Sequence, residues 1–152
     1  MKKLNRKGFT LIELLAVIVV LAIVLVVTIP SVLSSMSKAR EEQFKNAVAT
    51  VEEYMKKQID ACNLGDTTFA PYEKSIFISN NGTCEIKNNN NVVELSTIST
   101  IVKNAGYTLD INNSDKTADF ASINISKAGK VTAATAGADS KFSGATYSNS
   151  AS

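Results

Sequence analysis

Glu13 is the residue whose chemistry is hardest to explain, because it lies inside a long apolar segment. Residues 9–33 form a run of 25 residues in which Glu13 is the only charged side chain. A carboxylate at the centre of a membrane-spanning helix costs on the order of 3 kcal/mol. Near the end of the run the cost is smaller, since the side chain can reach the headgroups. Glu13 is therefore either an acid that reaches the membrane surface or a carboxylate with a cationic partner.

A cationic partner for Glu13 would have to be created, because no Lys or Arg lies within one helical turn on its C-terminal side. Cleavage after Gly8 would give a new amine at Phe9, four residues before the carboxylate. An amine and a carboxylate attract strongly in an apolar environment, although desolvation offsets much of the gain. The amine could belong to the same chain or to a neighbour, and a neighbour's amine would set the axial register between subunits.

The two cysteines, Cys62 and Cys84, both follow the apolar run. If that run places them outside the cytoplasm, they can form one disulfide. The alternative is a pair of free thiols, one on a helix and one on a strand.

The remaining polar residues do not indicate a catalytic site. The chain has no His and no Trp, which removes the commonest general base and metal ligand. Asp110, Asp115 and Asp119 could line a cation loop, but the segment lacks the Gly and the final Glu of an EF-hand, so we interpret it as a polar connection. We expect no enzymatic activity, no cofactor and no metal.

The element that must position Glu13 is an N-terminal helix. Residues 1–8 carry four positive charges, which predicts that they stay on the cytoplasmic side of a membrane. Residues 9–33 are long enough to span a bilayer as a helix. Pro30 has no backbone N–H and should kink or locally loosen this helix, but it need not end it.

Residues 34–62 continue the helix with a single apolar side. The apolar positions are spaced three or four residues apart, which indicates an amphipathic helix. These positions are Phe44, Val48, Val51, Met55, Ile59 and Cys62. Without the four leader charges the chain has 12 basic and 14 acidic residues, so no basic surface for nucleic acid is expected.

The sequence pattern of residues 63–136 is typical of a small antiparallel sheet domain. Asn81-Gly82 between two short β-rich runs, residues 75–79 and 83–87, predicts a hairpin. A polar loop is expected at residues 88–91 and a short helix at 96–104. Further strands are predicted at residues 107–111, 120–126 and 131–135. Residues 137–152 are rich in Gly, Ser and Ala, and we expect a mobile tail or a loosely docked end.

The order of basic leader, Gly8, Phe9, Glu13 and apolar helix resembles the class III signal of type IV prepilins and pseudopilins, over residues 2–33. The resemblance implies an α+β fold in which a long helix, apolar in its first half and amphipathic in its second, packs on a small antiparallel sheet. It also implies cleavage after Gly8 by a prepilin peptidase, N-methylation of Phe9 and pairing of Glu13 with the Phe9 amine of an adjacent subunit. Pro30 falls where such proteins often carry a proline. The Lys- and Asn-rich head suggests a Gram-positive source.

The function implied is a structural subunit of a type IV pilus. Such a subunit is a single-pass membrane precursor that becomes part of an extracellular filament. Its partners would be the bilayer, other pilin copies, the peptidase, and the membrane platform and ATPase of an assembly machine. One alternative is a pseudopilin of a competence or secretion system. Another is an ordinary exported or membrane-anchored protein, cut near Ser35-Met36-Ser37 or not at all.

Overall fold

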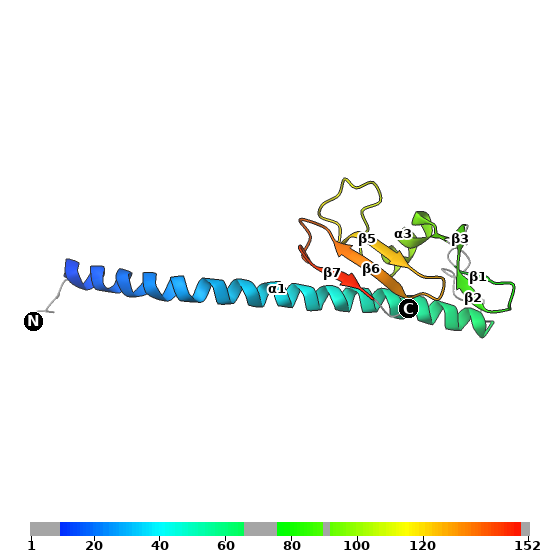
Figure 1. Cartoon of the computed structure of the whole chain (residues 1–152), viewed down its shortest axis with the longest axis horizontal. Coiled ribbons are helices and arrows are strands. Elements are labelled where there is room, and N and C mark those ends of the chain that lie inside the picture. Colours follow the sequence, from blue (N-terminus) through cyan, green and yellow to red (C-terminus); the bar gives the residue numbers. More distant parts are fainter. Residues whose placement is uncertain (1–9, 66–75, 90–91, 150–152) are drawn as a thin grey trace, which may run out of the picture. The chain divides into compact units, whose positions relative to one another are not determined.

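The computed structural model describes residues 10–65, 76–89 and 92–149. The protein is α+β, with a long N-terminal helix and small antiparallel sheets, which is the pilin fold predicted from the sequence (Figure 1). Two compact units follow one another along the chain, residues 1–36 and residues 37–152. The long helix contributes its apolar part to the first unit and its amphipathic part to the second.

Helix α1 spans Leu11–Asn63 and contains Pro30 without interruption. Proline removes one i to i−4 hydrogen bond, which leaves the carbonyl of Val26 without its usual donor. Two residues before Pro30, the Thr28 hydroxyl donates to the Val24 carbonyl oxygen at 2.9 Å. The helix nevertheless continues through the proline, as the spacing of apolar residues on both sides predicts.

The second half of α1 forms one wall of the core. Its predicted apolar stripe is confirmed: Phe44, Val48, Val51 and Met55 are buried almost completely, and Ile59 is half-buried against the same cluster. On the exposed side, the ion pairs Lys45–Glu41 and Lys57–Glu53 join residues one turn apart at 2.8 and 2.7 Å.

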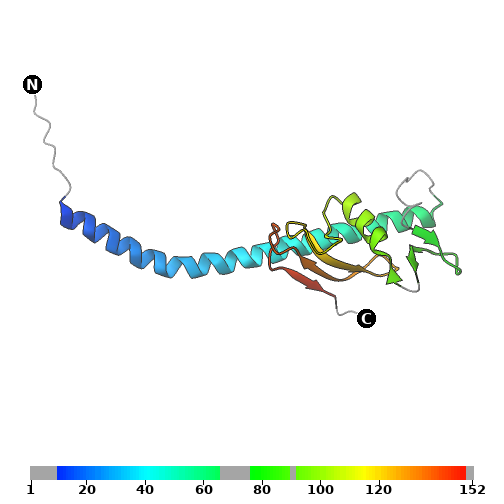
Figure 2. The ribbon, with the colours of Figure 1, turned by 90° about the horizontal axis from the view of Figure 1, so that it is seen from above.

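The sheets of the second unit are small. They comprise β1 (Ile76–Ile78) with β2 (Cys84–Ile86), β3 (Asn88–Asn89) with β4 (Val92–Val93), and a three-stranded sheet in the order β5 (Phe120–Ile125), β6 (Val131–Ala136), β7 (Thr146–Ser148). All these pairs are antiparallel. Helix α3 spans Leu95–Asn104. Figure 2 shows the three-stranded sheet alongside the C-terminal half of α1.

The buried face of β5 and β6 closes the core against α1. Phe44 of α1 lies with its ring centroid 5.2 Å from that of Phe120 on β5. The Glu52 carboxylate also accepts a hydrogen bond from the backbone N–H of Val131, at 2.8 Å, and so links helix to sheet. The hairpin predicted at Asn81-Gly82 is present, and Gly82 has the positive φ of 82° that such a turn favours.

The structure differs from the sequence-based expectation for residues 137–149. This segment packs in the core rather than forming a mobile tail, because Phe142 is 4% exposed and Thr146–Ser148 form β7 against β6. Gly137 starts the segment at a close approach, since a Cβ there would lie 2.2 Å from the Ala118 carbonyl oxygen. The sequence did not indicate this packing because the segment has few apolar residues, and its buried side chains are those of Ser140, Phe142 and Ala145. Residues 150–152 lie outside the described residues.

Two other local expectations also differ. Residues 107–111 do not form a strand, and only one parallel bridge joins Leu109 to Phe120. Asn88–Asn89, expected in a loop, form the short strand β3. In both places the neighbouring strand, and not the local sequence, determines whether the backbone finds a partner.

Candidate processing and assembly site

The structure gives Glu13 a local role at the beginning of α1. Its Oε2 accepts hydrogen bonds from both the backbone N–H and the hydroxyl of Thr10, each at 2.8 Å. In return the backbone N–H of Glu13 approaches the Thr10 hydroxyl oxygen at 3.4 Å. This reciprocal arrangement is a capping box, which satisfies N–H groups that the first turn of a helix leaves without partners.

Thr10 is therefore a site residue that the sequence analysis did not single out. The signal was present, since a Thr followed three residues later by a Glu is the sequence pattern of a capping box. Both Thr10 hydrogen bonds end on Oε2, and no described residue donates to Oε1. One carboxylate oxygen thus orients the side chain towards the helix start while the other can accept a further donor.

Gly8 and Phe9, the predicted cleavage and methylation positions, lie outside the described residues. Their geometry relative to Glu13 stays a prediction. Thr10, the first described residue, directly follows Phe9, and its N–H already points to the Glu13 carboxylate.

The helix that follows Glu13 presents apolar side chains in every direction. From Leu11 to Leu33 the large apolar side chains are between 50% and 84% exposed. By length and composition α1 can cross a membrane. Such a surface requires either lipid or other apolar helices around it.

The predicted disulfide is present between Cys62 and Cys84, with Cα atoms 6.0 Å apart. It joins the last turn of α1 to the first residue of β2, and both cysteines are buried. Next to it, the Asn63 side chain accepts a hydrogen bond from the Cys84 N–H at 2.9 Å. The bridge fixes the β1–β2 hairpin to the helix end.

The three aspartates that could have lined a cation loop serve their own loop instead. Asp110 accepts from the backbone N–H groups of Asn112 and Ser114, at 3.2 and 3.0 Å. Hydrogen bonds from the side chain and backbone of Thr117 lower the pKa of Asp115. Asp119 accepts hydrogen bonds from the backbone N–H and the hydroxyl of Thr108, each at 3.1 Å, and it also pairs with Lys141 at 3.1 Å. Among the described residues no three Asp, Glu, His or Cys side chains are grouped to hold a metal ion.

Comparison with known proteins identifies the N-terminal segment. Residues 3–29 match the family model of the prokaryotic N-terminal methylation motif. No curated protein and no solved structure matches the chain. The matched range includes part of the basic leader, the Gly8–Phe9 junction and Glu13, and it ends one residue before Pro30. The chain therefore carries a prokaryotic N-terminal methylation motif at the start of a long apolar helix, and it is consistent with a prepilin-like protein.

Proposed function

We propose that the chain is the precursor of a type IV pilin-like filament subunit. It is cut after Gly8, N-methylated at Phe9, and assembled through the apolar half of α1 into an extracellular filament. The observation that carries the proposal is the methylation motif at residues 3–29, placed at the beginning of a helix whose apolar surface is uncovered.

Burial of the apolar helix supplies the driving force for assembly in water. Apolar surface removed from water contributes about 25 cal/mol per Å². In the precursor, lipid covers this surface, so its transfer into a filament requires work from an ATPase and a membrane platform. Once outside the bilayer, the helix is stable only against other helices of the same kind, which makes further copies of the subunit its partners.

Glu13 supplies the specificity that apolar packing lacks. Its Oε2 is held by Thr10, which leaves Oε1 for the amine created at Phe9 when the leader is removed. An ion pair between Glu13 of one subunit and the Phe9 amine of the next would fix their axial offset. A carboxylate buried without a cation is strongly unfavourable, so misaligned subunits would be rejected.

The test separates the charge of Glu13 from its capping role. Gln can replace Glu in a capping box, so Glu13→Gln keeps the helix start and removes only the charge, whereas Glu13→Ala removes both. We expect both variants to lose most of their filament yield in sheared surface fractions. Loss of one partner of a buried pair costs about 3–5 kcal/mol per contact, which is enough to abolish assembly.

Thr10→Ser is the matched control, because it keeps the cap and leaves the carboxylate unchanged; its filament yield should stay close to that of the unmodified protein. Normal yield from Glu13→Gln would contradict ion pairing and leave capping as the whole role of Glu13.

N-terminal sequencing of the mature chain tests the processing step separately. We expect N-methylated Phe9 as the first residue, both in the protein of wild-type sequence and in the Glu13 variants. A mature chain that starts at Lys38 would indicate ordinary secretion, and an intact Met1 would indicate a simple anchor. A pseudopilin role shares the motif and the processing, and it would be distinguished by scarcity of the protein in sheared filaments.

A further inference from the structure

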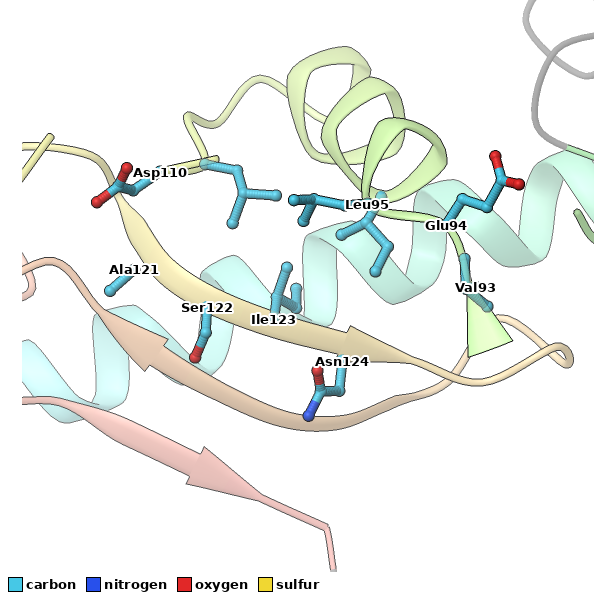
Figure 3. A pocket seen from close by; sticks show the side chains of 10 residues that line it. Val93, Glu94, Leu95, Asp110, Ala121, Ser122, Ile123 and Asn124 are labelled. Atoms are coloured by element: carbon cyan, nitrogen blue, oxygen red, sulfur yellow. The ribbon is translucent and has the colours of Figure 1, made fainter. Parts of the chain in front are cut away.

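An open groove of about 470 Å³ lies between α3 and the outer edge of β5 (Figure 3). Its apolar lining comes from β4, α3, the segment before β5 and β5 itself: Val93, Leu95, Ile98, Leu109 and Ile123. Most of these side chains belong to the core, but Leu95 is 48% exposed. The groove lies wholly within the second unit and apart from the N-terminal site.

The edge of β5 that faces this groove is only partly paired. β5 is an outer strand of its sheet, with β6 on one side. On the other side, residues 108–110 run parallel to its first residue: Phe120 donates to Thr108 at 3.0 Å and accepts from Asp110 at 2.9 Å. The chain then turns away at Asp110. Beyond Phe120, no other described strand covers this edge of β5.

An unpaired strand edge beside an apolar groove is the geometry that accepts an added β-strand. Main-chain hydrogen bonds to the edge provide the affinity, and the groove accepts alternate side chains of the incoming strand. Residues 108–110 already make the first contacts of such a strand. An extended segment in the groove would continue their line along Ala121–Asn124.

Two carboxylates lie at opposite ends of the groove, Glu94 and Asp110 (Figure 3). No Lys or Arg is among the lining residues. Glu94 occupies the N-cap position of α3, yet its side chain makes no capping hydrogen bond. Its Oε2 accepts one long hydrogen bond from the Ser96 hydroxyl, at 3.4 Å, and no described residue donates to its Oε1. Asp110 uses only Oδ1 for its turn, and among the described residues nothing donates to its Oδ2. Both carboxylates can therefore accept donors from outside the chain.

We propose that this groove binds an extended, basic segment of a partner protein, which adds to β5 as a strand and places a Lys or Arg near Glu94 and another near Asp110. The charge of the groove selects against acidic partners, because a carboxylate at either end would face one of like charge. The groove does not depend on the assembly role of α1, so either proposal can fail while the other stands.

The probe is a synthetic heptapeptide of alternating Thr and Val with Lys at both ends. It is titrated into the full-length protein in nonionic detergent micelles, and backbone amide shifts are followed by NMR. We expect the largest shifts at Ala121–Asn124. Glu94→Gln together with Asp110→Asn should weaken binding about fivefold, since exposed ion pairs are individually weak. Both substitutions preserve the local structure, because an Asn oxygen still accepts the turn hydrogen bonds.

Glu42→Gln together with Asp60→Asn is the control of equal charge change, because both residues lie on α1 and neither lines the groove; this double variant should leave the affinity unchanged. The same peptide with Glu at both ends should bind at least several-fold more weakly. A third peptide, with its alternate backbone amides methylated, should not bind, because it cannot complete the strand pairing.

Equal binding of the Lys- and Glu-ended peptides would overturn the proposal, and so would full binding of the methylated peptide. Shifts at Ala121–Asn124 that grow with protein concentration in the absence of peptide would also overturn it, in favour of a second copy of the chain in the groove.

Discussion

The hydrogen bonds between Thr10 and Glu13 give Glu13 a role in starting the helix, beside the assembly role that we propose for it. The capping hydrogen bonds at 2.8 Å explain why a carboxylate is tolerated at the start of an apolar helix, even before any ion pair forms. The same bonds use only Oε2, so Oε1 can still accept a further donor. A capping role and a pairing role are therefore compatible, and only the charge-neutral Glu13→Gln variant separates them.

The Cys62–Cys84 bridge is a residue-scale feature with a large expected effect on the stability of the head. It closes a loop with a sequence separation of 22 residues. Loop-closure entropy for that length predicts a contribution of about 3 kcal/mol. We expect the Cys62→Ser, Cys84→Ser double variant to lose about this amount of unfolding free energy in urea titrations.

Reduction of the unmodified protein should lower its stability to a similar value, and the reducing agent should have no effect on the double variant. Equal stability of the oxidised protein and the double variant would mean that the disulfide adds nothing to the stability that the core already provides.

At the scale of elements, α1 performs two tasks with two surfaces. Its first half is apolar all round and exposed, while its second half buries one side beneath the three-stranded sheet. The C-terminal segment completes that packing. The Phe142 ring lies 5.6 Å from the Phe44 ring, and β7 covers the edge of β6.

The C-terminal segment can be tested by removing its main core contact. Phe142→Ala should destabilise the protein by about 3 kcal/mol or more, because truncation of a buried Phe leaves a cavity. Thermal unfolding followed by circular dichroism would measure the loss. Ser148→Ala, an exposed change in the same segment, should stay within about 0.5 kcal/mol. If the Phe142→Ala variant were as stable as the Ser148→Ala variant, residues 137–149 would be a loose tail that does not contribute to the core.

At the scale of the whole molecule, the chain combines a unit that requires lipid or other helices with one that has its own core. Each buried apolar side chain of the described residues lies at or beyond Phe44, within the second unit. Filament formation and head folding should therefore be separable. That separation is what a subunit needs if its head is to stay folded while its helix passes from bilayer to filament.

The separation predicts that a fragment of residues 37–152 folds without detergent. We expect a monomer with one cooperative thermal transition, because it keeps the whole core and the disulfide. Its midpoint should lie within a few degrees of the head transition of the full-length protein in micelles. A fragment without a cooperative transition would show that the head depends on residues 1–36.

The sequence by itself determined the features that depend on local pattern. The basic leader, the Gly8–Phe9 junction, Glu13 and the apolar run are contiguous, so the match to the methylation motif could be anticipated from composition and order. The apolar residues from Phe44 to Cys62 repeat with the period of a helix, and the dipeptide Asn81-Gly82 is by itself typical of a hairpin turn.

Only the tertiary structure decided the features that depend on partners distant in sequence. Whether residues 107–111 and 137–149 become strands depends on which edge of the sheet is free, and neither segment has a strong pattern of its own. The open groove beside β5 arises because the chain leaves that edge at Asp110 after a single bridge. Pairing along a sheet joins residues far apart in the chain, and periodicity within a segment carries no information about it.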